Sequence, residues 1–237
     1  MVNRTWGYFF GRGIIEPVDD RRSGNPPSNP ELLDALTKDF IAHKFDVKNV
    51  MRTICRSRTY QLSIKPNRWN DDDSINFSHA TPRRLAAEQL LDSISIATGS
   101  TQKFNGLPLG FRASQLPDTQ VGAGGFMDLF GRPSRESPCE CERTSTVSLG
   151  QTLNLVNGPT LADAIADPDG RLAKLLKTNP DDKKIVEEIY LATLCRFPTE
   201  AEAAKAGEHL KKATSREEAA QDLLWALINT PAFLFNY

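Results

Sequence analysis

The stretch NPDDKKIVEEIYLATL, residues 179–194, decides the fold class of this chain. Its large apolar side chains recur at the spacing of one face of an α-helix, not at the strict alternation of a half-buried strand. The pair Asn179-Pro180 opens the segment, and proline is tolerated in a first helical turn because its missing N–H would have no partner there. The predicted buried side of this helix is Ile185, Val186, Ile189 and Leu194.

The same helical spacing extends from this segment in both directions. Two capping boxes, each a Ser or Thr followed three residues later by Glu, predict helix starts on its C-terminal side. These boxes are Thr199 with Glu202 and Ser215 with Glu218. On the N-terminal side, Asn29 caps a helix that begins at Pro30. Further helices are predicted over residues 1–10, from 46 towards 60, from 82 to 99, and from 149 and 161 onwards.

Each expected helix has one apolar side, and together these sides form the predicted core. They are Leu32, Leu33, Leu36 and Phe40; Val47, Val50, Met51 and Ile54; Leu85, Leu90, Leu91 and Ile94; Leu149, Leu153 and Val156; Leu161 and Ile165; and Leu223, Leu224, Leu227, Ile228 and Phe233. The sequence has no strand–helix alternation of the kind that a doubly wound sheet requires. We therefore predict a mainly α fold, a multi-helix orthogonal bundle that makes residues 1–237 a single helical domain.

One long segment, at about residues 100–146, lacks the helical pattern. Glycine, proline and serine are dense in it, and Gly122–Gly125 is its most flexible stretch. A structureless loop of this length is uncommon inside a compact domain. Three interpretations are open: a functional lid, an ordered irregular layer over the helices, or short strands around Phe111 and Phe126.

The composition excludes several classes of function. The chain has 237 residues, with 29 Lys+Arg against 30 Asp+Glu and a formal net charge of −1. This balance removes the electrostatic basis for bulk binding to nucleic acid. No run of residues approaches the roughly 18 apolar residues of a membrane helix. We predict neither a nucleic-acid partner nor a membrane span in this chain.

The first ten residues carry three large aromatic side chains, Trp6, Phe9 and Phe10, with no capping residue before them. They have no long apolar region followed by a small-residue cleavage site, so they do not form a signal peptide. We expect the sequence to be an N-terminally truncated piece of a longer protein. The aromatic side chains would then be a bare edge that faces a partner domain.

The charged residues Arg84, Glu88 and Asp92 fall at positions i, i+4 and i+8, which places them on one side of the expected helix. Paired carboxylates beside an arginine are able to serve as a general acid and a general base, as in hydrolases. The alternative is an ion-pair ladder that clamps this helix to its neighbours, joined by Arg4, Arg12 and Asp20. Polar groups between packed helices commonly satisfy one another in this way.

Four cysteines leave three interpretations open. Cys139 and Cys141 are one residue apart and would supply half of a tetrahedral metal site, with Cys55, Cys195 or a histidine completing it. The usual structural zinc spacing is wider, and the sequence has no second pair. Four is also an even number, which fits disulfides in an exported chain. In the third interpretation Cys55 and Cys195 are small core residues on helices, and the pair lies in a loop without a special role.

No cofactor site is predicted within this chain. His43, His79 and His209 are far apart in sequence, and we expect all three to be solvated. The Gly122–Gly125 stretch lacks the Lys-Ser/Thr of a phosphate-binding loop. No Cys-x-x-Cys-His motif occurs, so the chain cannot attach a c-type haem itself.

A series of short motifs runs in order along nearly the whole chain. They are Asn3-Arg4-Thr5-Trp6, Phe10-Gly11-Arg12-Gly13, Asn29-Pro30-Glu31-Leu32-Leu33-Asp34, Ser57-Arg58-Thr59-Tyr60-Gln61, Pro82-Arg83-Arg84-Leu85 with Glu88 and Asp92, Arg132-Pro133, Cys139-Glu140-Cys141-Glu142-Arg143, Gln151-Thr152-Leu153, Asn157-Gly158, Arg196-Phe197-Pro198-Thr199 and Asn229-Thr230-Pro231. With these motifs the sequence resembles a planctomycete-specific domain of unknown function, found at the C-terminal end of large proteins that also carry a cytochrome-c-like domain.

The resemblance implies a context rather than an activity. The family has no established catalytic residues to carry over. Its parent proteins are expected outside the cytoplasmic membrane, where c-type haem is attached, so haem c would be bound only by a separate domain. The resemblance thus implies an exported, non-catalytic helical module that packs against neighbouring domains, including a cytochrome-c-like one. The alternatives are a hydrolase or redox enzyme with an Arg84, Glu88 and Asp92 site, and a cysteine-based metal-binding module.

Overall fold

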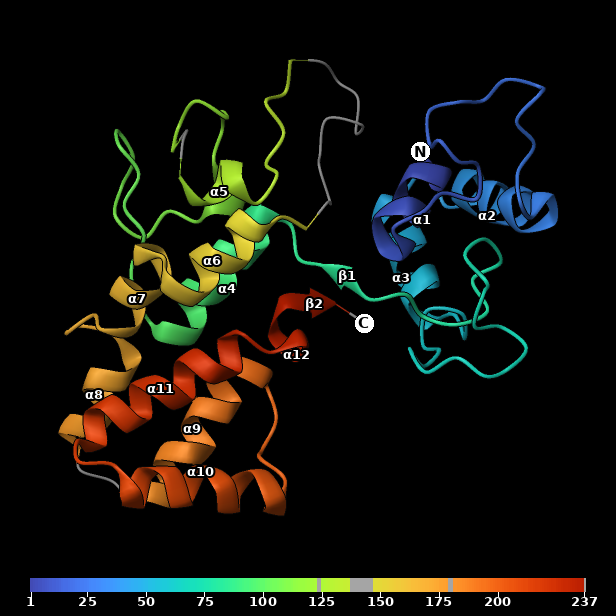
Figure 1. The fold of residues 1–237 in the computed structure, drawn as a ribbon. Helices are drawn as coiled ribbons and strands as arrows, with labels where there is room; N and C mark the ends of the chain where they lie inside the picture. The colour runs from blue at the N-terminus through green and yellow to red at the C-terminus, as the bar shows by residue number, and fades with distance from the viewer. Residues whose placement is uncertain (123–124, 137–146, 179–180, 237) are drawn as a thin grey trace. The chain divides into compact units, whose positions relative to one another are not determined.

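The computed structural model describes residues 1–122, 125–136, 147–178 and 181–236, and it is mainly helical (Figure 1). The predicted fold class, a mainly α multi-helix bundle, is confirmed. The described chain divides into two compact units, residues 1–83 and residues 84–236, each with its own apolar core. The assignment of residues 1–237 to one helical domain stays a prediction about the chain as a whole.

The first unit contains three mutually packed helices, α1 (Val2–Phe10), α2 (Pro30–Ala42) and α3 (Val47–Arg56). The starts of α2 and α3 follow the sequence: Asn29 accepts a hydrogen bond from the Leu32 N–H at 2.9 Å, and Asp46 accepts one from the Lys48 N–H at 2.8 Å. These caps satisfy N–H groups that have no partner within the helix. α3 ends at Arg56, earlier than predicted, and Met51 is exposed where a core position was expected.

The aromatic side chains of α1 form the centre of the first unit. Trp6 is only 2% exposed, and its ring stacks on Phe10 at 4.1 Å between centroids. Phe77 packs edge-on against Trp6 at 5.3 Å, and Tyr60 packs against Phe9 at 5.6 Å. The prediction of a bare aromatic edge is therefore wrong. The long loop after α3 supplies rings that cover α1, which helical periodicity alone cannot anticipate.

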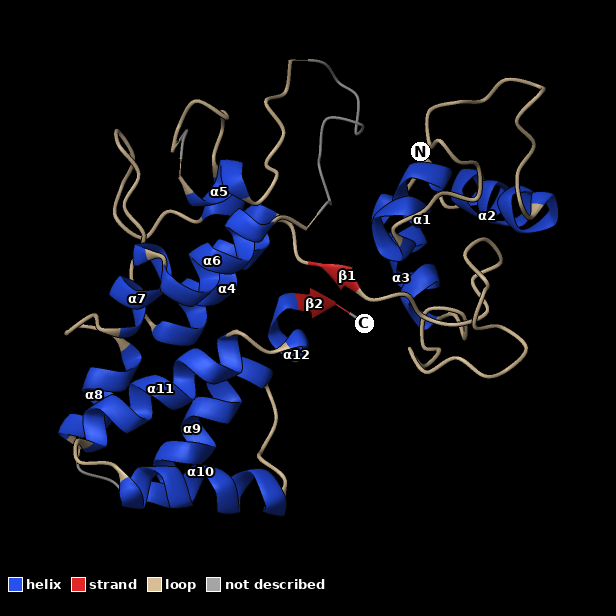
Figure 2. Cartoon of the chain, viewed as in Figure 1, coloured by secondary structure: helices blue, strands red, loops and turns tan. Residues whose placement is uncertain are grey.

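The second unit begins in the short strand β1 (Arg83–Arg84), which pairs with β2 (Phe235–Asn236) in a two-stranded sheet, drawn as red arrows in Figure 2. Between the strands lie the helical elements of this unit. They are α4 (Ala87–Thr98), the 3-10 turn η1 (Ala113–Gln115), α5 (Phe126–Leu129), α6 (Leu149–Asn157), α7 (Pro159–Ile165), α8 (Arg171–Lys177), α9 (Asp182–Leu194), α10 (Glu200–Lys212), α11 (Arg216–Ile228) and α12 (Pro231–Leu234).

Helix α4 is the central helix of the second unit. It contacts η1, α5, α7, α8 and α9, and its Leu90 and Ile94 side chains are fully buried. Ile185 on α9 and Ile228 on α11 are also fully buried, as the sequence predicted. Burying each such side chain contributes about 1.5–3 kcal/mol. This apolar core, rather than the short sheet, holds the unit together.

The start of α4 differs from its prediction. The Thr81-Pro82 start predicted a helix from residue 82, but Arg83 and Arg84 are extended in β1 and α4 begins at Ala87. Pairing with the C-terminal segment accounts for the difference, since the Leu85 N–H donates to the Leu234 carbonyl at 3.0 Å. Long-range pairing of this kind overrides local helix signals.

The end of α4 is fixed by a glycine and an arginine. Gly99 ends the helix with φ +70°, and a Cβ there would lie 2.8 Å from the backbone nitrogen of Arg171. The Arg171 guanidinium donates to the carbonyls of Ala97 and Ile96, both at 3.0 Å, which satisfies the C-terminal carbonyls of α4. Arg171 begins α8, a helix that the sequence analysis did not predict.

Helix α6 is where it was predicted but presents the opposite side to the core. Its buried side chains are Gln151 and Leu155. Leu149, Leu153 and Val156, the predicted core positions, are 74%, 53% and 41% exposed. We call these three side chains the α6 ridge. The helix is apolar on two sides, so periodicity could not tell which side faces the core.

The helices nearest the C-terminus follow their capping signals. Thr199 and Glu202 form the predicted capping box at α10, and Ser215 accepts a hydrogen bond from the Glu218 N–H at 3.2 Å at the start of α11. α9 is capped by Asp181, whose side chain accepts from the Lys184 N–H at 2.8 Å. The predicted Asn179-Pro180 start lies outside the described residues.

Candidate functional site

The described part of the irregular segment is an ordered layer on the second core. Phe104, Phe126, Met127 and Phe130 are each 8% exposed or less and belong to the same apolar cluster as α4. Phe126 and Phe130 stack at 4.2 Å between ring centroids. Of the three interpretations, the ordered layer is the one that the described residues show. Short strands around Phe111 and Phe126 are not found there, because this part contains η1 and α5 instead.

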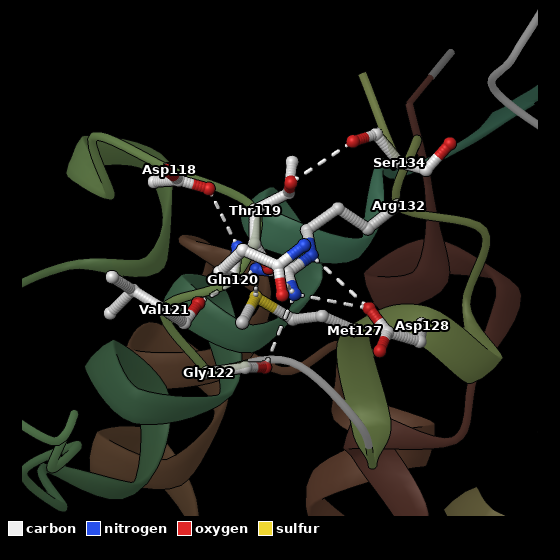
Figure 3. A network of polar contacts seen from close by, with 9 residues as sticks. All are labelled: Asp118, Thr119, Gln120, Val121, Gly122, Met127, Asp128, Arg132 and Ser134. Atoms are coloured by element: carbon white, nitrogen blue, oxygen red, sulfur yellow. Dashed lines mark hydrogen bonds and ion pairs between the residues drawn. The ribbon is translucent and has the colours of Figure 1, made fainter. Parts of the chain in front are cut away.

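Arg132 is the main polar contact of this layer (Figure 3). Its side chain is 4% exposed, and its guanidinium donates to the carbonyls of Thr119, Val121 and Gly122 at 2.6, 3.0 and 3.2 Å. The same group forms an ion pair with Asp128 at 3.1 Å. A guanidinium offers five N–H donors in a rigid fork, which suits several carbonyls of an irregular turn at once. Arg132 therefore adds three side-chain hydrogen bonds to carbonyls of this segment beside its short backbone turns.

Arg84, the first of the predicted site residues, fastens the same layer from β1. Its guanidinium donates to the Gln151 side chain and to the Phe130 carbonyl, the latter at 3.1 Å. Gln151 in turn donates to the Leu129 carbonyl at 2.9 Å, which joins α6 to the end of α5. Partial burial lowers the pKa of Arg84 from its usual value. The group keeps its charge at any physiological pH, because arginine starts from a pKa above 12.

Asp92, the third predicted site residue, accepts hydrogen bonds from the backbone N–H groups of Ala113 and Ser114 at 2.7 and 3.1 Å. It thereby fixes the start of η1 on α4. Glu88 lies in the first turn of α4, whereas Arg84 lies on β1. The prediction that all three lie on one helix face is wrong, because α4 begins only at Ala87. A catalytic role for these residues stays an untested prediction.

The residues that were expected to extend this cluster belong to the first unit and have their own partners there. Arg4 pairs with Asp19, and Asp20 forms an ion pair with Arg22 at 2.7 Å. Both carboxylates thus pair with an arginine of the first unit. The Nε atom of the remaining residue, Arg12, is buried without a hydrogen-bond partner in the described structure.

Asn3 is a polar residue whose role the sequence analysis missed. Its side chain is buried, donates to the carbonyls of Ile15 and Val18 at 2.9 and 3.1 Å, and accepts from the Ile15 N–H at 2.9 Å. It holds the loop after α1 against that helix. Gly13 permits this close approach, since a Cβ there would lie 2.3 Å from the Ile15 carbonyl oxygen. The Asn3 and Gly13 motifs were visible, but their contact depends on the fold.

The cysteine interpretations are only partly open to test. Cys139 and Cys141 lie outside the described residues. Cys55 and Cys195 are free thiols, half-buried on α3 and exposed at the end of α9. The interpretation of Cys195 as a core residue is therefore wrong. In the described ranges, no group of three or more His, Cys, Asp and Glu side chains is placed to hold a metal ion.

Two of the three histidines are exposed, as expected. His43 contacts Asp39 at 3.2 Å and His209 contacts Asp222 at 3.5 Å, both on the surface. His79 differs, because it is half-buried and its Nδ1 lies 3.0 Å from the Ala80 carbonyl oxygen. Its Nε2 atom is buried without a hydrogen-bond partner in the described structure.

A groove of about 850 Å³ lies between α9 and α10. Its floor consists of apolar or small residues, among them Val186, Ala203, Ala204 and Gly207. Phe197 lines one end and is 63% exposed. Charged side chains also line the groove: Asp182, Lys183, Glu187, Glu200, Glu208, Lys211 and Lys212. The groove is suited to a surface that is apolar at its centre and charged around it.

Comparison with known proteins identifies a family without an activity. A family model described as PSD1, a protein of unknown function (DUF1553), matches residues 1–210, which include the first unit and most of the second. No curated protein and no solved structure matches the chain. Among the described helices, none combines the length and the apolar character needed to cross a bilayer.

Proposed function

This chain belongs to the DUF1553 family of proteins of unknown function, and we propose that it is a non-catalytic helical module that packs against neighbouring domains of a longer protein. The family resemblance adds that the parent protein is exported and that one neighbour is a cytochrome-c-like domain carrying haem c. In this proposal the chain contributes a binding surface and a fixed geometry. The redox chemistry belongs to the neighbour.

The observation that carries the proposal is the α6 ridge. Leu149, Leu153 and Val156 fall at positions i, i+4 and i+7 and project from one short helix, 74%, 53% and 41% exposed. Trp225 lies beside them, 37% exposed, and its indole N–H donates to the Val156 carbonyl at 3.3 Å. Helical anchors at this spacing are typical of helix-mediated recognition. Contiguous exposed apolar residues mark interaction surfaces.

The polar residues support the same proposal by their contacts. Arg84, Asp92 and Arg132 bind backbone carbonyls, backbone N–H groups or a side-chain amide within the unit. Such groups stabilise an irregular layer without presenting a free acid and base pair to a substrate. We expect the two carboxyl groups of a catalytic pair to lie in a cleft, where different environments hold their pKa values apart.

The first test is the complete gene. We expect the reading frame that contains these residues to encode a signal peptide and a cytochrome-c-like domain with a Cys-x-x-Cys-His motif. A reading frame that encodes no further domain would overturn the proposal.

The second test measures binding between this chain and the adjoining domains of its parent protein by isothermal titration calorimetry. Leu153→Glu places a charge at the centre of the α6 ridge, and we expect it to weaken binding at least tenfold. Leu109→Glu is the matched control, because Leu109 is also exposed, at 67%, and lies outside the ridge. Equal binding by the wild type and Leu153→Glu would show that the ridge is not the contact.

A further inference from the structure

Helix α10 presents an uncovered face that is independent of the α6 ridge. The helix contacts α9 and α11, and Figure 1 shows it along one edge of the second unit with these two helices on its inner side. Its buried residues are Ala206 and Leu210. A second stripe of α10 lines the groove described above and includes Glu200, Ala203, Ala204, Gly207 and Lys211.

The middle of this stripe permits very close approach by another helix. Ala203, Ala204 and Gly207 have the smallest side chains available, and a Cβ built on Gly207 would meet no atom within 4 Å. Glycine costs an α-helix about 0.5–1 kcal/mol relative to alanine. Packing inside this chain does not require a glycine at this position. Small residues on a helix surface allow two helix backbones to pack closely.

The two ends of the stripe carry opposite charges, Glu200 in the first turn of α10 and Lys211 in the last, where each sign also suits the helix dipole. Both residues are exposed, and within the described residues neither forms an ion pair. The other charges along the groove are largely paired: Lys183 with Glu187 at 3.8 Å and Lys212 with Glu208 at 2.5 Å. Glu200 and Lys211 are separated by three helical turns, so they lie on one side of α10 and about 16 Å apart.

This arrangement is complementary to itself. If a second copy of α10 lies antiparallel across a two-fold axis, Glu200 faces the partner's Lys211, and Lys211 faces the partner's Glu200. The same operation sets Ala204 opposite the partner's Gly207, so the smallest residues meet at the centre. A two-fold interface requires one surface patch to match its own copy in this way. Opposite charges across it also fix the antiparallel register.

We propose that this chain forms a two-fold dimer in which each α10 occupies the groove between α9 and α10 of the other copy. The groove volume of about 850 Å³, spread over about 16 Å, gives a cross-section of about 50 Å². That is more than half the cross-section of a helix about 10 Å across. The groove is thus large enough for one side of a helix, which is what the dimer inserts.

The test is sedimentation equilibrium of the full chain with charge-reversal variants. We expect the wild type to dimerise, Glu200→Lys and Lys211→Glu each to weaken dimerisation at least tenfold, and the double reversal to restore it to within threefold. Mixing the two single variants should give a heterodimer. The stripe of Glu200→Lys then has a lysine at both ends, and that of Lys211→Glu has a glutamate at both ends, so each attracts the other and repels its own copy. Lys205→Glu is the matched control, since Lys205 is exposed on α10 and does not line the groove.

A steric variant separates docking from folding. Gly207→Gln adds a good helix former where the monomer has open space, so thermal stability should hold or rise while dimerisation is lost. A monomeric wild type at 100-micromolar concentration would overturn the proposal, as would a dimer that Gly207→Gln leaves intact. If the groove instead binds a helix of another protein, the wild type would be monomeric at this concentration. Either outcome leaves the α6 ridge test unaffected, because the two surfaces share no residue.

Discussion

Two parts of the second unit, the irregular layer around α5 and the helices α9 to α11, share one apolar cluster but satisfy their backbone polar groups differently. In α9 to α11 the backbone groups bond within each helix, and apolar side chains such as Ile189 and Leu224 fill the space between helices. The irregular layer has only short backbone turns, and the guanidinium groups of Arg84 and Arg132 bond four further carbonyls, those of Thr119, Val121, Gly122 and Phe130. The comparison teaches that buried side chains can supply donors to the carbonyls that the short turns of an irregular segment do not bond.

Among the predictions, we expect the removal of Arg132 to have the largest effect on the stability of the irregular layer. Arg132→Met keeps much of the bulk of the side chain but leaves three carbonyls without their buried donor, and we expect unfolding to become easier by about 3–5 kcal/mol. Chemical denaturation of the second unit measures the effect. Arg135→Met is the control, because Arg135 is exposed and nearby, and its change should stay within about 0.5 kcal/mol. Equal stabilities of the two variants would contradict the account.

We expect the helices α9 to α11 to be destabilised instead by a cavity in their apolar core. Leu224 is 2% exposed on α11, and Leu224→Ala should destabilise the unit by about 2–4 kcal/mol through lost burial and an unfilled cavity. Denaturant midpoints give this value, and Leu223→Ala, at a less buried position of the same helix, should cost clearly less. A Leu224→Ala protein as stable as Leu223→Ala would mean that α11 is not packed as described.

The link between the two parts is Asp92, which lies on α4 and binds the start of η1. The Ala113 and Ser114 N–H groups bond to different oxygens of the Asp92 carboxylate, so Asp92→Asn loses one of the two hydrogen bonds and removes the charge that strengthens the other. We expect a loss of about 1–2 kcal/mol. Faster proteolysis near η1 would accompany it. Unchanged stability of Asp92→Asn would contradict the role of Asp92 in fixing η1 to α4.

The smallest expected effect is the pH dependence at the start of α10. The bidentate contact with Arg196 lowers the pKa of Glu202 to about 2, aided by the Thr199 N–H. A depressed carboxyl pKa stabilises the folded state above the unfolded pKa near 4.5, and this stabilisation is lost as pH falls towards 2. Melting curves of Glu202→Gln and the wild type should therefore converge as pH falls from about 5 to 2. A constant difference would contradict the assigned contact.

Much of the helical framework follows from sequence, and its failures have physical causes. Capping by Asn29, Asp46 and Thr199 is local chemistry, so these helix starts were predictable. Which side of α6 is buried was not predictable, because both sides carry leucine. Nor was the role of Arg132 or Asn3, since each binds carbonyls that only the folded loop brings near.

The candidate site shows the same limit. Spacing placed Arg84, Glu88 and Asp92 on one helix face, but the pairing of β1 with β2 removes Arg84 from that helix. Once Arg84 lies in a strand, its guanidinium reaches Gln151 and the Phe130 carbonyl, contacts that the i, i+4 pattern does not contain. Residue types were informative about polarity, but their geometry depended on long-range pairing.

Residue-resolved hydrogen exchange on the wild type and Arg132→Met tests the central comparison most directly. We expect the amides of Leu129, Phe130 and Arg132, which bond within the layer, to exchange at least a hundredfold faster in the variant. The amides of α9 and α11 should keep their protection under the same native conditions. Unchanged exchange in the layer, or an equal acceleration in α9 and α11, would contradict the claim that buried arginine donors hold this segment separately from the helices.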